Sequence, residues 1–129
     1  MPALCVLSAG KTITLAASLF TLSWTHSVER VRWEEDWRLT PAGLEIVEAR
    51  VKGSGAGMEP PADAILKNGW WAYRPAIPPR EQIVLAASGA TTSPWRLCAA
   101  GACLDLGATA GEPVTLGACT EPDVGTSRR

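Results

Sequence analysis

The stretch "FTLSWTHSVERVRWEEDWRLTPAGLEIVEARV", residues 20–51, alternates apolar and polar side chains almost throughout. A period of two is typical of a half-buried β-strand, because successive side chains point to opposite faces of a sheet. Residues 19–28, 31–39 and 44–52 are therefore expected to form three strands. The turn-forming residues "TPAG" (40–43) separate the last two of them. The stretch thus predicts consecutive antiparallel hairpins.

The rest of the chain repeats this pattern. Glycine and proline interrupt short runs rich in Val, Ile, Leu, Thr and Trp about every ten residues. We expect an all-β fold, a single small antiparallel β-sandwich or partly open barrel of about 8–10 short strands. Residues 1–118 would form this domain, with 119–129 as a flexible tail and one helical turn within "PPADAILKNG" (60–69). The further strands are expected at 3–8, 12–16, 69–74, 82–87, 95–99, 102–106 and 113–116.

Composition narrows the function classes. The 129 residues are 47% hydrophobic and carry a net charge of −1, without the basic patch that nucleic acid requires. No apolar run reaches the roughly 18 residues of a membrane span, so the chain is not expected to cross a bilayer. No basic residue precedes the apolar N-terminal run, so we expect no signal peptide. The default location is therefore the cytoplasm, with an extracytoplasmic location as the alternative.

The four cysteines are Cys5, Cys98, Cys103 and Cys119. They contain no Cys-x-x-Cys pair, so a zinc ribbon is not expected. Cys98 and Cys103 flank "AAGA", which suits a hairpin loop and would place the two side chains opposite each other. They would form a disulfide in an oxidising compartment and remain packed thiols in a reducing one.

The only histidine, His26, falls on the apolar side of its expected strand. A hairpin that turns at Arg30 and Val31 pairs apolar positions, with Trp24 opposite Trp37. The same register places His26 opposite Glu35, so that two polar residues on apolar faces meet.

The next hairpin has two alternatives of nearly equal merit. In the first, the apolar pairs are Leu39 with Leu44 and Trp37 with Ile46. Glu48 then lies opposite Glu35, and Arg50 shares their face. The second parity buries Val47, Ala49 and Val51 instead. Under the first, one sheet face carries a polar end beside an apolar wall, roofed by a glycine-rich loop. The candidate binding residues are then His26, Glu35, Glu48, Arg50, Trp24, Trp37, Gly55 and Gly57.

This cluster has three interpretations: a closed charge network, a ligand or partner site, or a catalytic site with His26 as acid or base and Glu35 as its orienting group. No nucleophile, cofactor or metal motif accompanies it. The glycine-rich "VKGSGAGMEPP" (51–61) is followed by prolines rather than a helix, so it does not resemble a phosphate-binding loop. We therefore expect no catalytic residues, no metal and no cofactor.

The blocks "THSVE", "WEEDWRL" and "EARVKGSGAGM", with the later "GWW" and "WRLC", resemble the bacterial family catalogued as domain of unknown function 1850. The resemblance covers nearly the whole chain except its tail and implies no established activity. It implies an association with permeases of the TAXI class of TRAP transporters, beside which such proteins are often encoded. The matching motif residues are Thr25, His26, Ser27, Val28, Glu29, Glu34, Glu35, Glu48, Arg50, Gly55 and Gly57.

Together these observations favour a non-enzymatic accessory or ligand-sensing domain for solute transport. Its partner would be a small polar ligand or the permease itself. The alternatives are a small enzyme that uses His26, and a structural domain that docks through the aromatic "GWWAY" (69–73).

Overall fold

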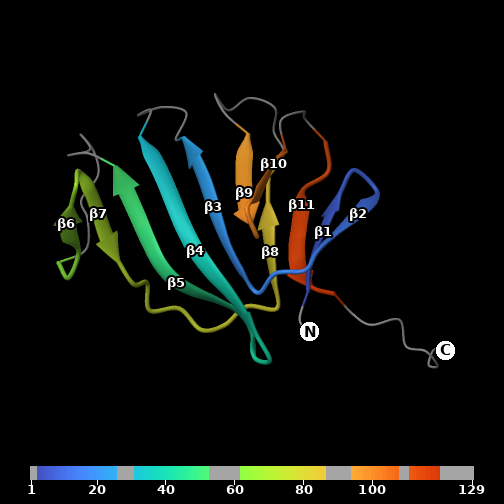
Figure 1. The fold of residues 1–129 in the computed structure, drawn as a ribbon, viewed down its shortest axis with the longest axis horizontal. Coiled ribbons are helices and arrows are strands. Elements are labelled where there is room, and N and C mark those ends of the chain that lie inside the picture. Colours follow the sequence, from blue (N-terminus) through green and yellow to red (C-terminus); the bar gives the residue numbers. More distant parts are fainter. Residues whose placement is uncertain (1–2, 26–30, 53–61, 87–93, 108–110, 120–129) are drawn as a thin grey trace.

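The computed structural model describes residues 3–25, 31–52, 62–86, 94–107 and 111–119 (Figure 1). In these ranges the regular structure is entirely β, and none contains a helix long and apolar enough to cross a membrane. The strands are β1 (Leu4–Ser8), β2 (Lys11–Leu15), β3 (Leu19–Thr25), β4 (Arg32–Thr40), β5 (Gly43–Lys52), β6 (Ile65–Lys67), β7 (Trp70–Tyr73), β8 (Gln82–Leu85), β9 (Trp95–Ala99), β10 (Ala102–Leu106) and β11 (Val114–Ala118).

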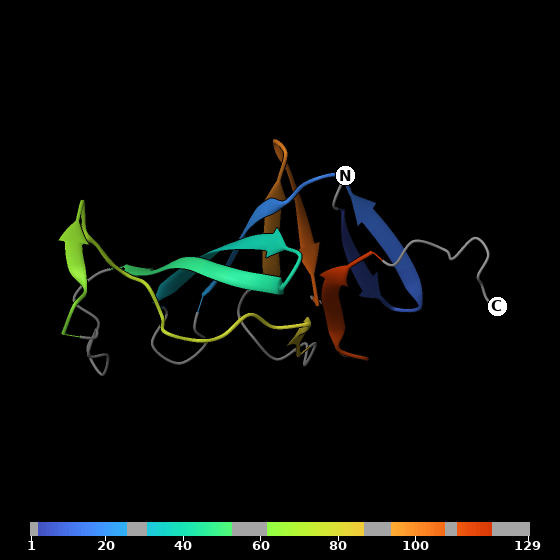
Figure 2. The same ribbon diagram turned by 90° about the horizontal axis from the view of Figure 1, so that it is seen from below.

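The strands form two antiparallel sheets. A four-stranded sheet has the order β2-β1-β11-β8, and a seven-stranded sheet has the order β10-β9-β3-β4-β5-β7-β6. Seen from below, the β9–β10 hairpin stands across the direction of β4 and β5 (Figure 2). The predicted all-β antiparallel sandwich is confirmed, and the sheets are not closed into a barrel.

The core lies between the two sheets. Leu4 and Leu116 of the smaller sheet and Leu22, Leu44 and Leu97 of the larger one are all at most 1% exposed. These side chains belong to one buried cluster, so the burial of apolar area joins the sheets. We call the face of the larger sheet that carries this cluster the inner face, and the opposite face the outer face.

The ten predicted strands correspond to observed ones, and β6 is the strand that was missed. The predicted helical turn within 60–69 is wrong in its described part, because Ile65–Lys67 pairs with β7. Asn68 and Gly69, with φ of 51° and 85°, form the turn between these strands. An Asn-Gly pair with two positive φ angles favours a tight β-hairpin over a helix.

The cysteines form two disulfides, Cys5–Cys119 and Cys98–Cys103. The first joins residues 114 apart in the sequence, and the second joins residues five apart across the β9–β10 hairpin. The pairing of Cys98 with Cys103 expected for an oxidising compartment is thus the observed one. Of the predicted tail, Cys119 is described and is bonded to Cys5, and residues 120–129 lie outside the described residues.

Candidate functional site

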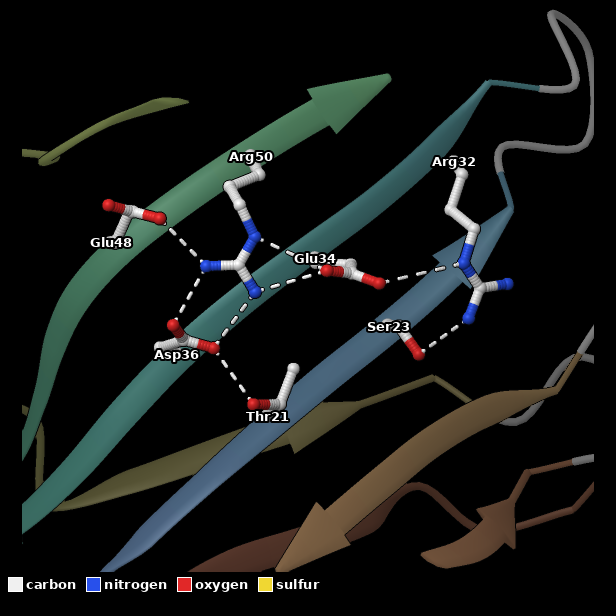
Figure 3. A network of polar contacts seen from close by, with 7 residues as sticks. All are labelled: Thr21, Ser23, Arg32, Glu34, Asp36, Glu48 and Arg50. Carbon is white, nitrogen blue, oxygen red and sulfur yellow. Dashed lines mark hydrogen bonds and ion pairs between the residues drawn. The ribbon is translucent and has the colours of Figure 1, made fainter. Parts of the chain in front are cut away.

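A cluster of polar side chains is centred on Arg50 of β5, on the outer face of the larger sheet (Figure 3). Its Nη1 donates to Glu48 Oε2 at 2.7 Å and to Asp36 Oδ2 at 2.8 Å. Its Nη2 donates to Asp36 Oδ1 at 3.1 Å and to Glu34 Oε1 at 3.0 Å, and Nε donates to Glu34 Oε1 at 3.2 Å. All three guanidinium nitrogens are therefore engaged, and the side chain is 21% exposed.

Neighbouring strands extend this cluster. Asp36 Oδ1 accepts a hydrogen bond of 2.8 Å from Thr21 Oγ1 of β3. On the other side, Glu34 Oε2 lies 3.8 Å from Arg32 Nε, and Arg32 Nη2 donates to Ser23 Oγ at 3.0 Å. We call the whole set the polar array; its members are Thr21, Ser23, Arg32, Glu34, Asp36, Glu48 and Arg50.

The array sets the ionisation of its members. Hydrogen bonds from Arg50 lower the pKa of Asp36, burial opposes this shift, and the bond from Thr21 adds to the lowering. The hydrogen bond to Asp36 likewise raises the pKa of the Arg50 guanidinium, with burial opposing and Glu48 and Glu34 contributing less. Both groups are thus held in their charged forms.

A β-bulge explains why the array lies on the outer face. Between β4 and β5, Trp37 pairs with Ile46, but the next residue back, Asp36, pairs with Glu48. Val47 is therefore an extra residue on β5, and it reverses the faces of everything that follows it on that strand.

The predicted pairing of this hairpin is therefore correct near the turn and wrong beyond the bulge. Glu35 lies opposite Ala49 rather than Glu48, and Arg50 lies opposite Glu34. Ala49 and Val51 are buried, as the alternative parity requires, at 1% and 2% exposure.

The predicted β3–β4 register is also wrong. Trp24 lies opposite Trp33, four residues before the predicted partner Trp37, and the two indole rings stack with centroids 6.1 Å apart. Glu35 lies opposite Leu22 rather than opposite His26. The prediction assumed a two-residue turn, whereas the last described pair of the hairpin is Thr25 with Arg32, which leaves six residues, 26–31, between the two strands.

The structure therefore separates the predicted site. Trp24, Glu35 and Trp37 share the inner face, whereas Glu48 and Arg50 lie on the outer face, so the expectation of one common face is wrong. His26, Gly55 and Gly57 lie outside the described residues.

Glu35 is a partly buried carboxylate on the inner face. Burial raises its pKa, although a 3.0 Å hydrogen bond from Trp37 Nε1 and the positive charge of Arg80 both favour the ionised form. Burial also raises the pKa of Tyr73, and the charge of Glu35 adds to that shift. Glu35 and Asp36 are adjacent in sequence, yet their pKa values move in opposite directions because they lie on opposite faces.

These opposite shifts predict opposite stability effects. A raised folded-state pKa makes the stability contribution of Glu35 fall as pH rises above about 4.5. Glu35→Gln keeps an acceptor for Trp37 and should stabilise the protein at pH 7 by less than about 1 kcal/mol, with no gain at pH 3. Melting temperatures measured between pH 3 and pH 8 test this expectation.

Asp36→Asn is the matched comparison. A lowered folded-state pKa gives a stability contribution that is present above pH 3.8 and is lost as pH falls through the lowered value. The variant should lose about 1–2 kcal/mol at pH 7, since solvent screens a side chain that is 36% exposed. Changes of the same sign in both variants at pH 7 would contradict the assignment of the two residues to different environments.

A hollow opens on the outer face beside the array. Its volume is about 620 Å³, and it lies between Thr21, Asp36 and Val47 on one side and Cys98–Cys103 of the β9–β10 hairpin on the other. Leu19, Phe20 and Trp37 also line it, so its wall is largely apolar, with Asp36 as its only charged side chain among the described residues. Among the same residues, no three His, Cys, Asp or Glu side chains are placed to hold a metal ion.

Sequence reasoning missed Asp36, and it gave Glu34 only as a residue that matches the family motif, not as a site residue. Their signal was present: Arg32, Glu34 and Asp36 occupy every second position of one strand and all are charged. The predicted site was built only from the apolar face of this strand, so the charged row on the opposite face was not considered.

The domain is thus a small antiparallel sandwich with a polar array and a hollow on one open sheet face. It belongs to the family described as "Domain of unknown function (DUF1850)", whose profile matches residues 20–106. That range contains every member of the array and both strands of the β9–β10 hairpin. No curated protein and no solved structure matches the chain.

Proposed function

We propose that this domain is a non-catalytic ligand-binding module, and that it serves a solute uptake system as an accessory component. The observation that carries the proposal is the hollow of about 620 Å³ beside the polar array. Its size falls within the range of about 300–1,000 Å³ typical of small-molecule sites. Its largely apolar wall with a few polar groups at one side also suits a small organic ligand.

Glu48 and Arg50 keep a role in this proposal, although not the one that their sequence positions indicated. Arg50 fixes Asp36 through two hydrogen bonds, and Asp36 lines the hollow. The array would therefore act as a rigid, preorganised wall, which lowers the entropic cost of binding. Further hydrogen-bonding capacity would come from the remaining acceptor capacity of the Thr21 hydroxyl and from the backbone of Ala100 and Gly101, between the paired strands.

The link to uptake rests on the resemblance to proteins encoded beside TAXI-type permeases. Two disulfides support a location in an oxidising compartment, because cytosolic thiols are kept reduced. The domain would then act on the outer side of the membrane, where solutes are captured.

Ligand screening of the intact protein tests the proposal. A library of small organic molecules, observed by amide chemical shifts, should yield ligands that move Thr21, Asp36 and Val47. Val47→Trp places a large side chain at the hollow and should weaken these ligands at least about tenfold, or about 1.4 kcal/mol. Val84→Trp is the control, since Val84 is 60% exposed on β8 of the other sheet.

Two outcomes would contradict the proposal. One is a screen without saturable binders, and the other is a set of ligands whose affinity Val47→Trp leaves unchanged. For the transport link, the domain should co-purify with its permease after mild crosslinking of membranes. Its absence from permease preparations would limit the function to ligand binding alone.

A further inference from the structure

A second hollow lies on the same outer face, two residues further along β3. Its volume is about 290 Å³, and its lining residues are Ser23, Arg32, Pro94, Arg96 and Asp105. Thr21 lines the larger hollow and Ser23 the smaller one, so a repeat of about 7 Å along the strand separates them. The smaller hollow contains two guanidinium groups, whereas the larger one contains none.

Two arginines from different strands flank Ser23. Arg96 of β9 lies directly opposite Ser23 in the sheet, and Arg32 of β4 donates a hydrogen bond to its hydroxyl group. Ser23 is a residue of β3 and is only 4% exposed, so it lies at the bottom of the hollow. Arg32 therefore contacts the buried hydroxyl directly, and Arg96 lines the same hollow from the strand on the other side.

The guanidinium groups of this hollow differ from that of Arg50 in how they are neutralised. All three guanidinium nitrogens of Arg50 donate to carboxylates, so this group has no donor left for a ligand. Arg32 has one hydrogen bond, to Ser23, and a loose 3.8 Å pairing with Glu34. Each guanidinium has five N–H donors, so most donors of Arg32 have no protein acceptor among the described residues.

Arg96 is similarly open. Its described contact is one 3.2 Å ion pair from Nε to Asp105 Oδ1, in which both side chains are about half exposed. An exposed ion pair of this kind contributes little to stability. An incoming anion therefore displaces Asp105 from Arg96, or shares the guanidinium group with it, at small cost. Nη1 of Arg32 and both terminal nitrogens of Arg96 have no acceptor among the described residues. The planar guanidinium group can donate from two nitrogens to two oxygens of one anion.

We propose that the hollow between Arg32 and Arg96 is an oxyanion site, which binds a carboxylate or phosphate group. The Ser23 hydroxyl and the two guanidinium forks supply the donors. The extension to a physiological ligand rests on the proposed function: the anionic end would lie here, and the apolar body would lie in the larger hollow. The anion site itself is testable without that ligand.

The experiment titrates the intact protein with sodium phosphate and, separately, with sodium acetate. Ionic strength is held constant with sodium chloride, and the signals of the Ser23 and Arg96 amides and of the arginine Nε–H groups are followed. At least one oxyanion should give saturable shifts, with dissociation constants in the millimolar range or tighter. Preference for acetate assigns the site to carboxylates, and preference for phosphate assigns it to phosphorylated ligands.

Variants separate the site from general charge effects. Arg96→Gln and Arg32→Gln should each weaken the oxyanion at least tenfold, and the double variant should abolish saturation. Arg38→Gln is the matched control: Arg38 lies on the same strand as Arg32, is 46% exposed and pairs with a single carboxylate, that of Glu45. It removes the same charge and should leave binding within twofold of the parent.

Melting temperatures of all variants verify that each remains folded. The proposal is overturned if neither anion saturates. It is also overturned if Arg38→Gln weakens binding as much as Arg96→Gln, because the response would then follow net charge. Neither failure bears on the larger hollow, because its test uses a library of small organic molecules and the variant Val47→Trp.

Discussion

The double variant Cys5→Ala/Cys119→Ala should lose about 2–5 kcal/mol of unfolding free energy, the largest effect we expect from any single crosslink. The bond closes a loop of 114 residues, and the entropy that a crosslink removes from the unfolded chain grows with the logarithm of loop length. Chain entropy alone gives about 5 kcal/mol for such a loop. Guanidinium denaturation followed by tryptophan fluorescence measures this loss.

Cys98→Ala/Cys103→Ala provides the comparison within the same molecule. This bond spans a separation of five residues, for which chain entropy gives about 2 kcal/mol. The two variants remove identical chemical groups, so their difference isolates loop length. Equal losses would contradict the entropic account and would indicate that packing around the sulfur atoms determines the effect.

Arg50→Gln should lose about 2–4 kcal/mol at pH 7. Without the guanidinium, the carboxylates of Glu34, Asp36 and Glu48 face one another, and only the looser 3.8 Å contact of Glu34 with Arg32 remains. The range lies below that of a fully buried ion pair, because these side chains are 21–37% exposed to water. Urea denaturation of parent and variant at pH 7 gives the difference.

Acid should reduce this loss. Arg50 lowers the pKa of Asp36, so the stabilisation that it provides is present above pH 3.8 and declines as the carboxylates are protonated. At pH 3 the variant should therefore lie closer to the parent. Arg38→Gln, which leaves one carboxylate instead of three, should cost less than about 0.5 kcal/mol. An Arg50→Gln loss no larger than this would show that solvent screens the whole array.

The strands were predictable because their signal is local. Alternation with a period of two identified β3, β4 and β5, and it placed Trp24 and Trp37 correctly on a common face. What failed was the pairing between strands. Both the register of β3 with β4 and the bulge at Val47 depend on contacts across the sheet, which periodicity in one strand does not contain.

The two alternatives for β5 illustrate this limit. Burial of Leu44 and Ile46 and burial of Ala49 and Val51 were treated as exclusive, and the structure shows both, one on each side of Val47. Each parity is correct for half of the strand. The candidate site does not form a single cluster, because Glu48 and Arg50 follow the bulge at Val47 and lie on the face opposite to Glu35.

Val47 also affects how relatives of this domain should be aligned. The side chain at position 47 matters less than the presence of one residue there, since the count alone turns Glu48 and Arg50 away from the core. A relative that keeps both charged residues but has one residue fewer after the turn would direct them inward, where unpaired charges are costly. The number of residues between the turn and the arginine should therefore be compared among relatives, in addition to the identities of the residues.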